Sequence, residues 1–361
     1  MKGSVFMKKN MRRLVSTILA CTLVFSSFAL TGCGGSDSGD TAADGSQTYD
    51  LRLATLYPAD HELTISAQAA ADKIEEETGG NVKITIYPSD QLGDYTSVYE
   101  EVMKGTIDMT INTMVTTYDS NLEMLTIPYL ASSYEEAKEI FCNPDSYFFQ
   151  TVRDEQRNLN LETLGIYVSG AMGVGAAKPL ADVMDPTVAK PALIRCPSMD
   201  SYLWTAKDGF NFNTVTINYS ELYSSLQTGV CDGWVGGGAY VNYLNFRDVL
   251  DYFCDARYIF ENIVCIMNKE LYDSMPAEYQ TIITEAFQES SNVFVDEMEA
   301  LDTQAMEDMA AMGIEIYTPT EEEFETMREH FRTNVWPKYE NTLDADIYKA
   351  LLENGLTAAV E

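Results

Sequence analysis

The alternation of strand-like and helix-like segments is the feature of this 361-residue sequence that most limits its possible folds. Apolar residues recur first at every second position, then at helical spacing, and the change repeats. Strands joined by helical crossovers form parallel βαβ units, whose strand carboxyl ends meet at one edge of the sheet. The first set comprises strands at 49–57, 81–87 and 107–113, with helices at 62–78 and 95–104.

A second set follows a helical stretch at 134–160, and the chain is long for a single core. Two α/β lobes with a ligand cleft between them are therefore expected, with 49–165 mainly in the first lobe and 166–275 mainly in the second. The second set comprises strands at 162–169, 192–196, 212–218 and 231–235, with helices near 199–208 and 220–228.

The remaining part, 276–361, begins with an unusually long helical pattern at 276–312. This helix is long enough to span both lobes, and the C-terminal helices after it are expected to pack on both. A short strand at 314–317 precedes Thr320, which is predicted to cap a helix that opens with three glutamates.

The N-terminus has the three parts of a secretory signal: four clustered cations, an apolar stretch at 14–30 and small residues before Cys33. The apolar stretch is short for a membrane span and is interrupted by two serines. Residues 30–33, Leu-Thr-Gly-Cys, resemble the bacterial lipobox, which implies a signal peptide at 1–32 and lipidation of Cys33. The polar run 33–48 then tethers the protein to the outer face of the cytoplasmic membrane, the periplasmic side in a Gram-negative cell.

The charge is strongly acidic, with 56 Asp and Glu against 23 Lys and Arg and a formal net charge of −33. Such a field repels nucleic acid, which is excluded as a partner. An anionic ligand therefore needs a local positive group.

Enzyme signatures are missing. There is no GxSxG, HExxH or P-loop motif, and the histidines are His61 and His330 alone.

Five cysteines lie beyond Cys33, an odd number without CxxC spacing, so we expect small buried side chains. We predict no catalytic residue, cofactor or metal. The alternatives are an exported enzyme, such as a cysteine-dependent hydrolase, and a surface adhesin.

Four segments carry a resemblance to a known family. Residues 58–110 contain EETGG, then P..QLG, then G..D; residues 194–197 read IRCP; residues 221–233 read ELYSSLQTGVCDG; and residues 268–276 read NKELYDSMP. In this order they resemble the solute-binding proteins of TRAP transporters, the DctP-type family, over roughly residues 50–340.

The resemblance implies a two-lobed, periplasmic-binding-protein-like α/β fold that closes on a small organic acid and hands it to TRAP membrane subunits. The family's carboxylate clamp corresponds to Arg195. A guanidinium holds a carboxylate through two parallel hydrogen bonds. A structural ion pair between the lobes is the alternative role for Arg195, and Lys178 and Lys190 are expected to be solvated.

The pattern departs from the family after the Asp-Gly turn, where Trp234 and glycines 236–238 follow. Trp234 is interpreted either as a stacking surface for the ligand or as a core residue, and Gly236 as a donor of backbone N–H groups to an anion. A monoacid with an apolar or aromatic body is thus favoured over a C4-dicarboxylate. The first-lobe candidates for ligand contact are Tyr57, His61, Tyr95 and Thr113.

Overall fold

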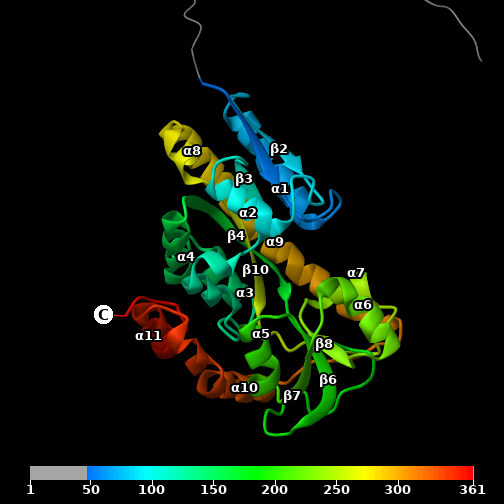
Figure 1. The fold of residues 1–361 in the computed structure, drawn as a ribbon. Coiled ribbons are helices and arrows are strands. Elements are labelled where there is room, and N and C mark those ends of the chain that lie inside the picture. The colour runs from blue at the N-terminus through cyan, green and yellow to red at the C-terminus, as the bar shows by residue number, and fades with distance from the viewer. Residues whose placement is uncertain (1–46, 361) are drawn as a thin grey trace, which may run out of the picture. The chain divides into compact units, whose positions relative to one another are not determined.

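The first of two β-sheets carries the N-terminal βα units. A computed structural model describes residues 47–360, and in it this sheet has the order β2-β1-β3-β10-β4 (Figure 1). β1 is parallel to β2 and β3, whereas β10 is antiparallel to β3 and β4. The strands are β1 (Tyr49–Ala54), β2 (Val82–Tyr87), β3 (Met109–Thr113), β4 (Leu161–Ala171) and β10 (Phe260–Asn268).

The second sheet has the order β11-β9-β5-β8-β6-β7. β6 is parallel to β7 and β8, and β5 is antiparallel to β8 and β9. The expected α/β fold with two lobes is confirmed. The strands are β5 (Val174–Ala176), β6 (Lys190–Cys196), β7 (Phe212–Thr216), β8 (Gly233–Val235), β9 (Tyr252–Cys254) and β11 (Glu315–Tyr317).

Helices cover both sheets, and polar side chains cap several of them, including the predicted cap Thr320. The side chain of Asp94 accepts hydrogen bonds from the first turn of α2, and Thr320 forms a capping box with Glu323 at α10. The helices are α1 (Glu62–Glu77), α2 (Tyr95–Met103), α3 (Tyr134–Ala137), α4 (Tyr147–Asn158), α5 (Asp200–Trp204), α6 (Tyr219–Thr228), α7 (Ala239–Phe246), α8 (Lys269–Ser274), α9 (Ala277–Ala311), α10 (Glu321–Asn334) and α11 (Ala345–Asn354).

Four strands depart from the sequence-based assignment. The strand expected at 162–169 in the second set is β4 of the first sheet, and β5, β9 and β10 were not predicted. All eleven residues of β4 are buried, so its sequence has no alternation to show which sheet it joins. The chain therefore passes to the second sheet after Ala171 and returns before Phe260.

α9 spans the two sheets, as expected from its length (Figure 1). Near its start, the Phe287 carbonyl oxygen accepts a hydrogen bond from the Tyr167 hydroxyl of β4. Near its end, Met309 belongs to the apolar cluster beneath the second sheet. The C-terminal segment also contacts both halves, because Phe331 packs on Phe210 and the Trp336 indole N–H donates to Pro128.

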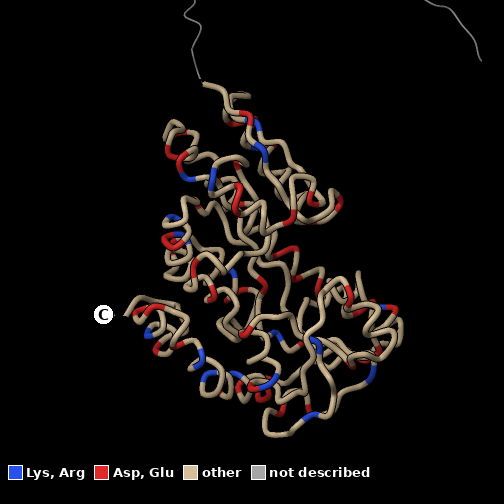
Figure 2. The backbone as a smooth tube through the Cα atoms, viewed as in Figure 1, with Lys and Arg blue, Asp and Glu red and all other residues tan. Residues whose placement is uncertain are grey.

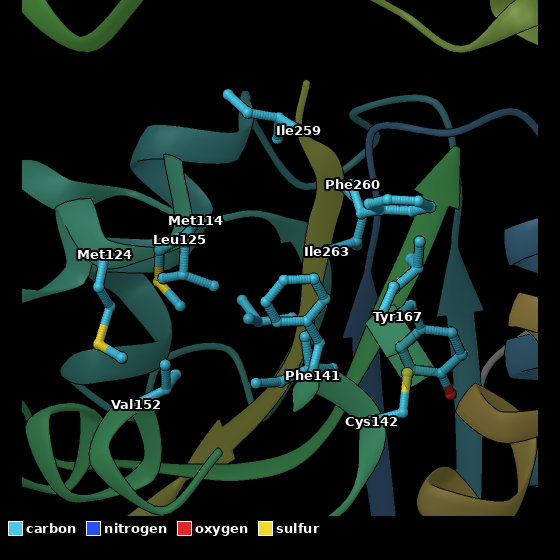
Figure 3. Packing of buried hydrophobic residues seen from close by; sticks show 14 of the residues in the cluster. Met114, Met124, Leu125, Phe141, Cys142, Val152, Tyr167, Ile259, Phe260 and Ile263 are labelled. Atoms are coloured by element: carbon cyan, nitrogen blue, oxygen red, sulfur yellow. The ribbon is translucent and has the colours of Figure 1, made fainter. Parts of the chain in front are cut away.

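The larger apolar core extends from the first sheet through the crossing strands to the second sheet, and Figure 3 shows part of it. Phe260 and Ile263 of β10 pack there beside Tyr167 and Cys142. The cysteines at 142, 196, 231, 254 and 265 are all buried and unpaired, as predicted.

Acidic positions are spread over the described part of the chain, with Lys and Arg scattered between them (Figure 2). No helix within residues 47–360 has both the length and the apolar character of a membrane span. Cys33 and the predicted signal peptide lie outside the described residues.

Candidate functional site

A cavity of about 710 Å³ lies where β3 and β6 end and β10 begins. Its first-lobe wall includes Tyr95 at the start of α2 and Thr113 at the end of β3. The opposite wall comes from the segment after β6, including Tyr202. A cavity of this size accommodates a small organic molecule. It therefore occupies the cleft position expected from the carboxyl ends of the strands.

The four first-lobe candidates lie close to the cavity, but in different roles. Tyr95 and Thr113 line it. Tyr57 interacts with the Thr113 side chain, and its ring centroid lies 4.5 Å from that of His61. The Nδ1 atom of His61 accepts the Leu63 N–H at 3.1 Å, which caps α1. The histidine thus supports Tyr57 and the helix start, and burial lowers its pKa.

Arg195 lies next to the end of β6, between Val215 of β7 and Trp234 of β8. It is 5 % exposed. Its Nε donates to the Ile217 carbonyl oxygen at 2.8 Å, and its guanidinium carbon lies 5.9 Å from the centre of the Tyr219 ring. Arg195 does not itself line the cavity, but it interacts electrostatically with Tyr202, which does.

Trp234 and Gly236 are not brought to the cavity. Trp234 is 3 % exposed, packs against Phe246 with ring centroids 5.1 Å apart, and donates its indole N–H to Asn242 at 3.0 Å. This geometry favours the core-packing alternative. Gly236 donates its N–H to the Gly173 carbonyl oxygen, so that group already has a partner.

The start of α7, which follows glycines 236–238, was expected to receive a ligand anion. It faces instead the carboxylate of Asp302. Asp302 of α9 accepts the Tyr240 N–H at 2.8 Å and the Ala171 N–H at 3.1 Å, and the Tyr134 hydroxyl also donates to it. Asp302 is 5 % exposed, and burial raises its pKa to about 6. It therefore joins α9 to α3, to the end of β4 and to the start of α7.

The prediction that Lys190 is solvated was wrong. The side chain is buried, and its Nζ donates to the carbonyl oxygens of Asp185, Val188 and Phe210. Burial lowers its pKa to about 8. Lys178 is more than half exposed and pairs with Asp232. Both lysines thus have partners away from the cavity, so Arg195 stays the candidate anion-binding group among these three cations.

Sequence reasoning missed Tyr202, Glu261 and Asn262, which all line the cavity. Tyr202 follows the end of β6, so the rule that ligands bind at strand carboxyl ends applied to it. Glu261 and Asn262 follow Phe260 at the start of β10, and these two polar residues precede the apolar run IVCIM. A charged residue in an otherwise buried strand was the available signal.

Comparison with known proteins agrees with this architecture. The family model described as bacterial extracellular solute-binding protein, family 7 (DctP) matches residues 53–342. The sialic acid-binding periplasmic protein SiaP of Vibrio cholerae is 24% identical over 262 residues, covering 72% of this chain and 79% of that protein.

Two solved structures have the same fold. A TRAP periplasmic solute-binding protein from Desulfovibrio salexigens with bound orotic acid aligns with a TM-score of 0.73 and 21% identity, covering 86% of this chain and 99% of that one. A second TRAP periplasmic solute-binding protein, from Pseudomonas putida F1 with bound D-glucuronate, aligns with a TM-score of 0.70 and 19% identity. The alignment covers 86% of this chain and 98% of that one. Because the family model spans most of the sequence, this chain belongs to the DctP family of bacterial extracellular solute-binding proteins.

Proposed function

We propose that this protein captures a small organic acid in the cavity, with Arg195 as the anchor of its carboxylate, and delivers it to the membrane subunits of a TRAP transporter. The similar proteins support an acidic ligand, since their names and bound molecules are sialic acid, orotic acid and D-glucuronate. The position of the cavity between the two sheets supports capture by closure of the lobes around the ligand.

The observation that carries this proposal is a buried cation without a counter-charge. Within residues 47–360, Arg195 forms no ion pair, and its one hydrogen bond uses Nε. Burying an unpaired charge is unfavourable, and burial lowers the pKa of this guanidinium. A ligand carboxylate beside Tyr202 would supply the missing negative charge and accept from the two terminal nitrogens.

The alternative of a cysteine-dependent hydrolase lacks a suitable nucleophile among the described residues. Each of the five cysteines there is buried, and burial raises the pKa of Cys142 and Cys196 to about 12. A catalytic thiol needs the opposite shift and access to substrate.

Lipid anchoring at Cys33 completes the proposal. The Leu-Thr-Gly-Cys sequence and the polar run that follows it support a tethered protein outside the cytoplasmic membrane. An acidic protein held there has no need of a basic surface for attachment.

The test is calorimetric titration with the acid recovered from the purified native protein. Losing one partner of a buried charged pair costs about 2–5 kcal/mol, so Arg195→Ala should weaken binding roughly 30-fold to several thousand-fold. Arg195→Lys should restore only part of the affinity, because an ammonium lacks the planar fork.

Arg247→Ala is the matched control, since that side chain donates to carbonyl oxygens at the end of α7. Its affinity should equal that of the native protein. Native affinity in a folded Arg195→Ala protein would contradict the proposed role of Arg195.

A further inference from the structure

The cavity wall is acidic although the proposed ligand is an acid. Glu123, Asp200 and Glu261 line it, and no Lys, Arg or His within the described range does. Glu123 has both oxygens engaged, one with the Thr116 hydroxyl and the other with the Thr126 hydroxyl. The part of the ligand that does not reach Arg195 therefore meets carboxyl groups.

Glu261 differs from Glu123 because most of its acceptor capacity is unused. Its Oε2 accepts from the Ser169 hydroxyl at 2.9 Å, and its Oε1 has no hydrogen bond among residues 47–360. It forms no ion pair there either. An ionised carboxylate offers about four acceptor sites, so a single hydroxyl satisfies only a small part of it.

An irregularity in the sheet places Glu261 at the cavity. Phe260 pairs with Ala171 and Asn262 with Val168, so β4 has one residue more than β10 between these pairs. The extra length includes Gly170, whose φ of +133° suits glycine. Bulges of this kind redirect side chains next to binding sites, and here Glu261 meets Ser169 beside the cavity.

Further polar atoms of the wall also lack partners. The Asn262 side chain is 7 % exposed, its Nδ2 donates to the carbonyl oxygens of Leu125 and Phe260, and its Oδ1 has no partner. From the opposite wall, the buried Ser201 hydroxyl is also without a partner. Buried acceptors without donors are rare in native proteins, so Asn262 adds a second acceptor next to Glu261.

Tyrosine side chains from both lobes interact electrostatically with Glu261. Burial raises the pKa of Tyr57, Tyr202 and Tyr219, and the negative charge of Glu261 raises it further. Tyr202 and Tyr219 are also the tyrosines next to Arg195. The two charged groups thus border the same aromatic wall, with Glu261 on the first sheet and Arg195 on the second.

We propose that Glu261 is a specificity-determining residue, which accepts a hydrogen bond from an amino or hydroxyl group on the acid whose carboxylate Arg195 binds. The inference rests on the proposed function and narrows the ligand class. An acid with a wholly apolar body leaves the Oε1 of Glu261 and the Oδ1 of Asn262 without donors in the closed cavity, whereas a hydroxy or amino acid supplies one. Burial raises the pKa of Glu261, in keeping with a carboxyl group that accepts from a single hydroxyl.

The experiment compares matched carboxylic acids as ligands of the intact protein. One set is hexanoate with its terminal hydroxyl and terminal amino derivatives; the other is para-toluate with para-(hydroxymethyl)benzoate and para-(aminomethyl)benzoate. Affinity is measured by thermal shift over a concentration series. In the native protein, a donor-bearing member of at least one set should bind about tenfold or more tightly than its parent acid.

Glu261→Leu should abolish this preference while the parent acid keeps its affinity. Glu261→Gln should lose the preference for the amino derivative but keep the preference for the hydroxyl derivative. Glu270→Leu, at an exposed position on α8, is the matched control and should keep the native preference. The role of Glu261 would be overturned if the native protein bound parent and donor-bearing acids equally, or if the preference survived in Glu261→Leu. Neither result would contradict the proposed function. Stabilisation by no member of either set would count against the proposed function, and the inference would fall with it.

Discussion

The buried carboxylate of Asp302 should make the stability of this protein depend on pH in an unusual direction. Burial raises its pKa from 3.8 to about 6. Between pH 3.8 and about pH 6, Asp302 is therefore protonated in the folded state and ionised in the unfolded chain. Stability from this group is greatest below about pH 4 and falls as the pH rises through 6.

The magnitude follows from the shift. A difference of about two pKa units corresponds to about 3 kcal/mol, lost in full at neutral pH. Three donors, from Tyr134, Ala171 and Tyr240, hold the carboxylate in place against this cost. Asp302→Asn keeps the shape of the side chain but does not titrate. The unfolding free energy of this variant therefore lacks the pH dependence that Asp302 contributes.

The assay is urea unfolding of both proteins between pH 4 and pH 7.5, followed by tryptophan fluorescence. The native protein should lose up to about 3 kcal/mol of unfolding free energy relative to Asp302→Asn across this range. Glu299→Gln, on the exposed face of the same helix, controls for substitution in α9. A difference between native protein and Asp302→Asn that is constant with pH, or grows with pH in favour of the native protein, would refute the reasoning.

Two further predictions concern the anchor and the core. Cys33→Ser should release the protein into the medium or leave an uncleaved precursor. Membrane fractionation and mass measurement of the N-terminus check this. An unchanged membrane fraction without acyl mass on the native N-terminus would exclude lipidation. Trp234→Ala should destabilise the fold by about 3–5 kcal/mol and leave the affinity of the folded protein within a few-fold. A large loss of affinity with unchanged melting would instead support ligand stacking on Trp234.

Local patterns in the sequence predicted the local structure well. The first βα units match the expected ranges closely, since alternating and helical periodicities depend on near neighbours along the chain. The long helix and the Thr320 cap were predicted for the same reason. Neither requires knowledge of which strands pair.

Long-range pairing was beyond the sequence. β4 and β10 are buried over nearly their whole length, and their antiparallel pairing joins residues about one hundred positions apart. The bulge that brings Glu261 to Ser169 exists only once these strands pair. Part of the site was therefore predictable from the sequence, through Tyr95, Thr113 and the resemblance around Arg195, whereas the position of Glu261 at the cavity was not.

Trp234 shows a second limit. A tryptophan after a strand is compatible with both a ligand surface and a core position, and its partners decide between them. Those partners, Asn242 and Phe246, belong to α7, which the sequence pattern did not predict.

If the cavity holds an organic acid bound through Arg195, the purified protein should carry that acid. Mass spectrometry identifies the small molecules released on denaturing the native protein and Arg195→Ala, prepared in parallel. We expect a carboxylic acid in near-equimolar amount from the native protein and little or none from Arg195→Ala. A released ligand without a carboxylate, or equal recovery of the same acid from both proteins, would contradict binding of an organic acid through Arg195.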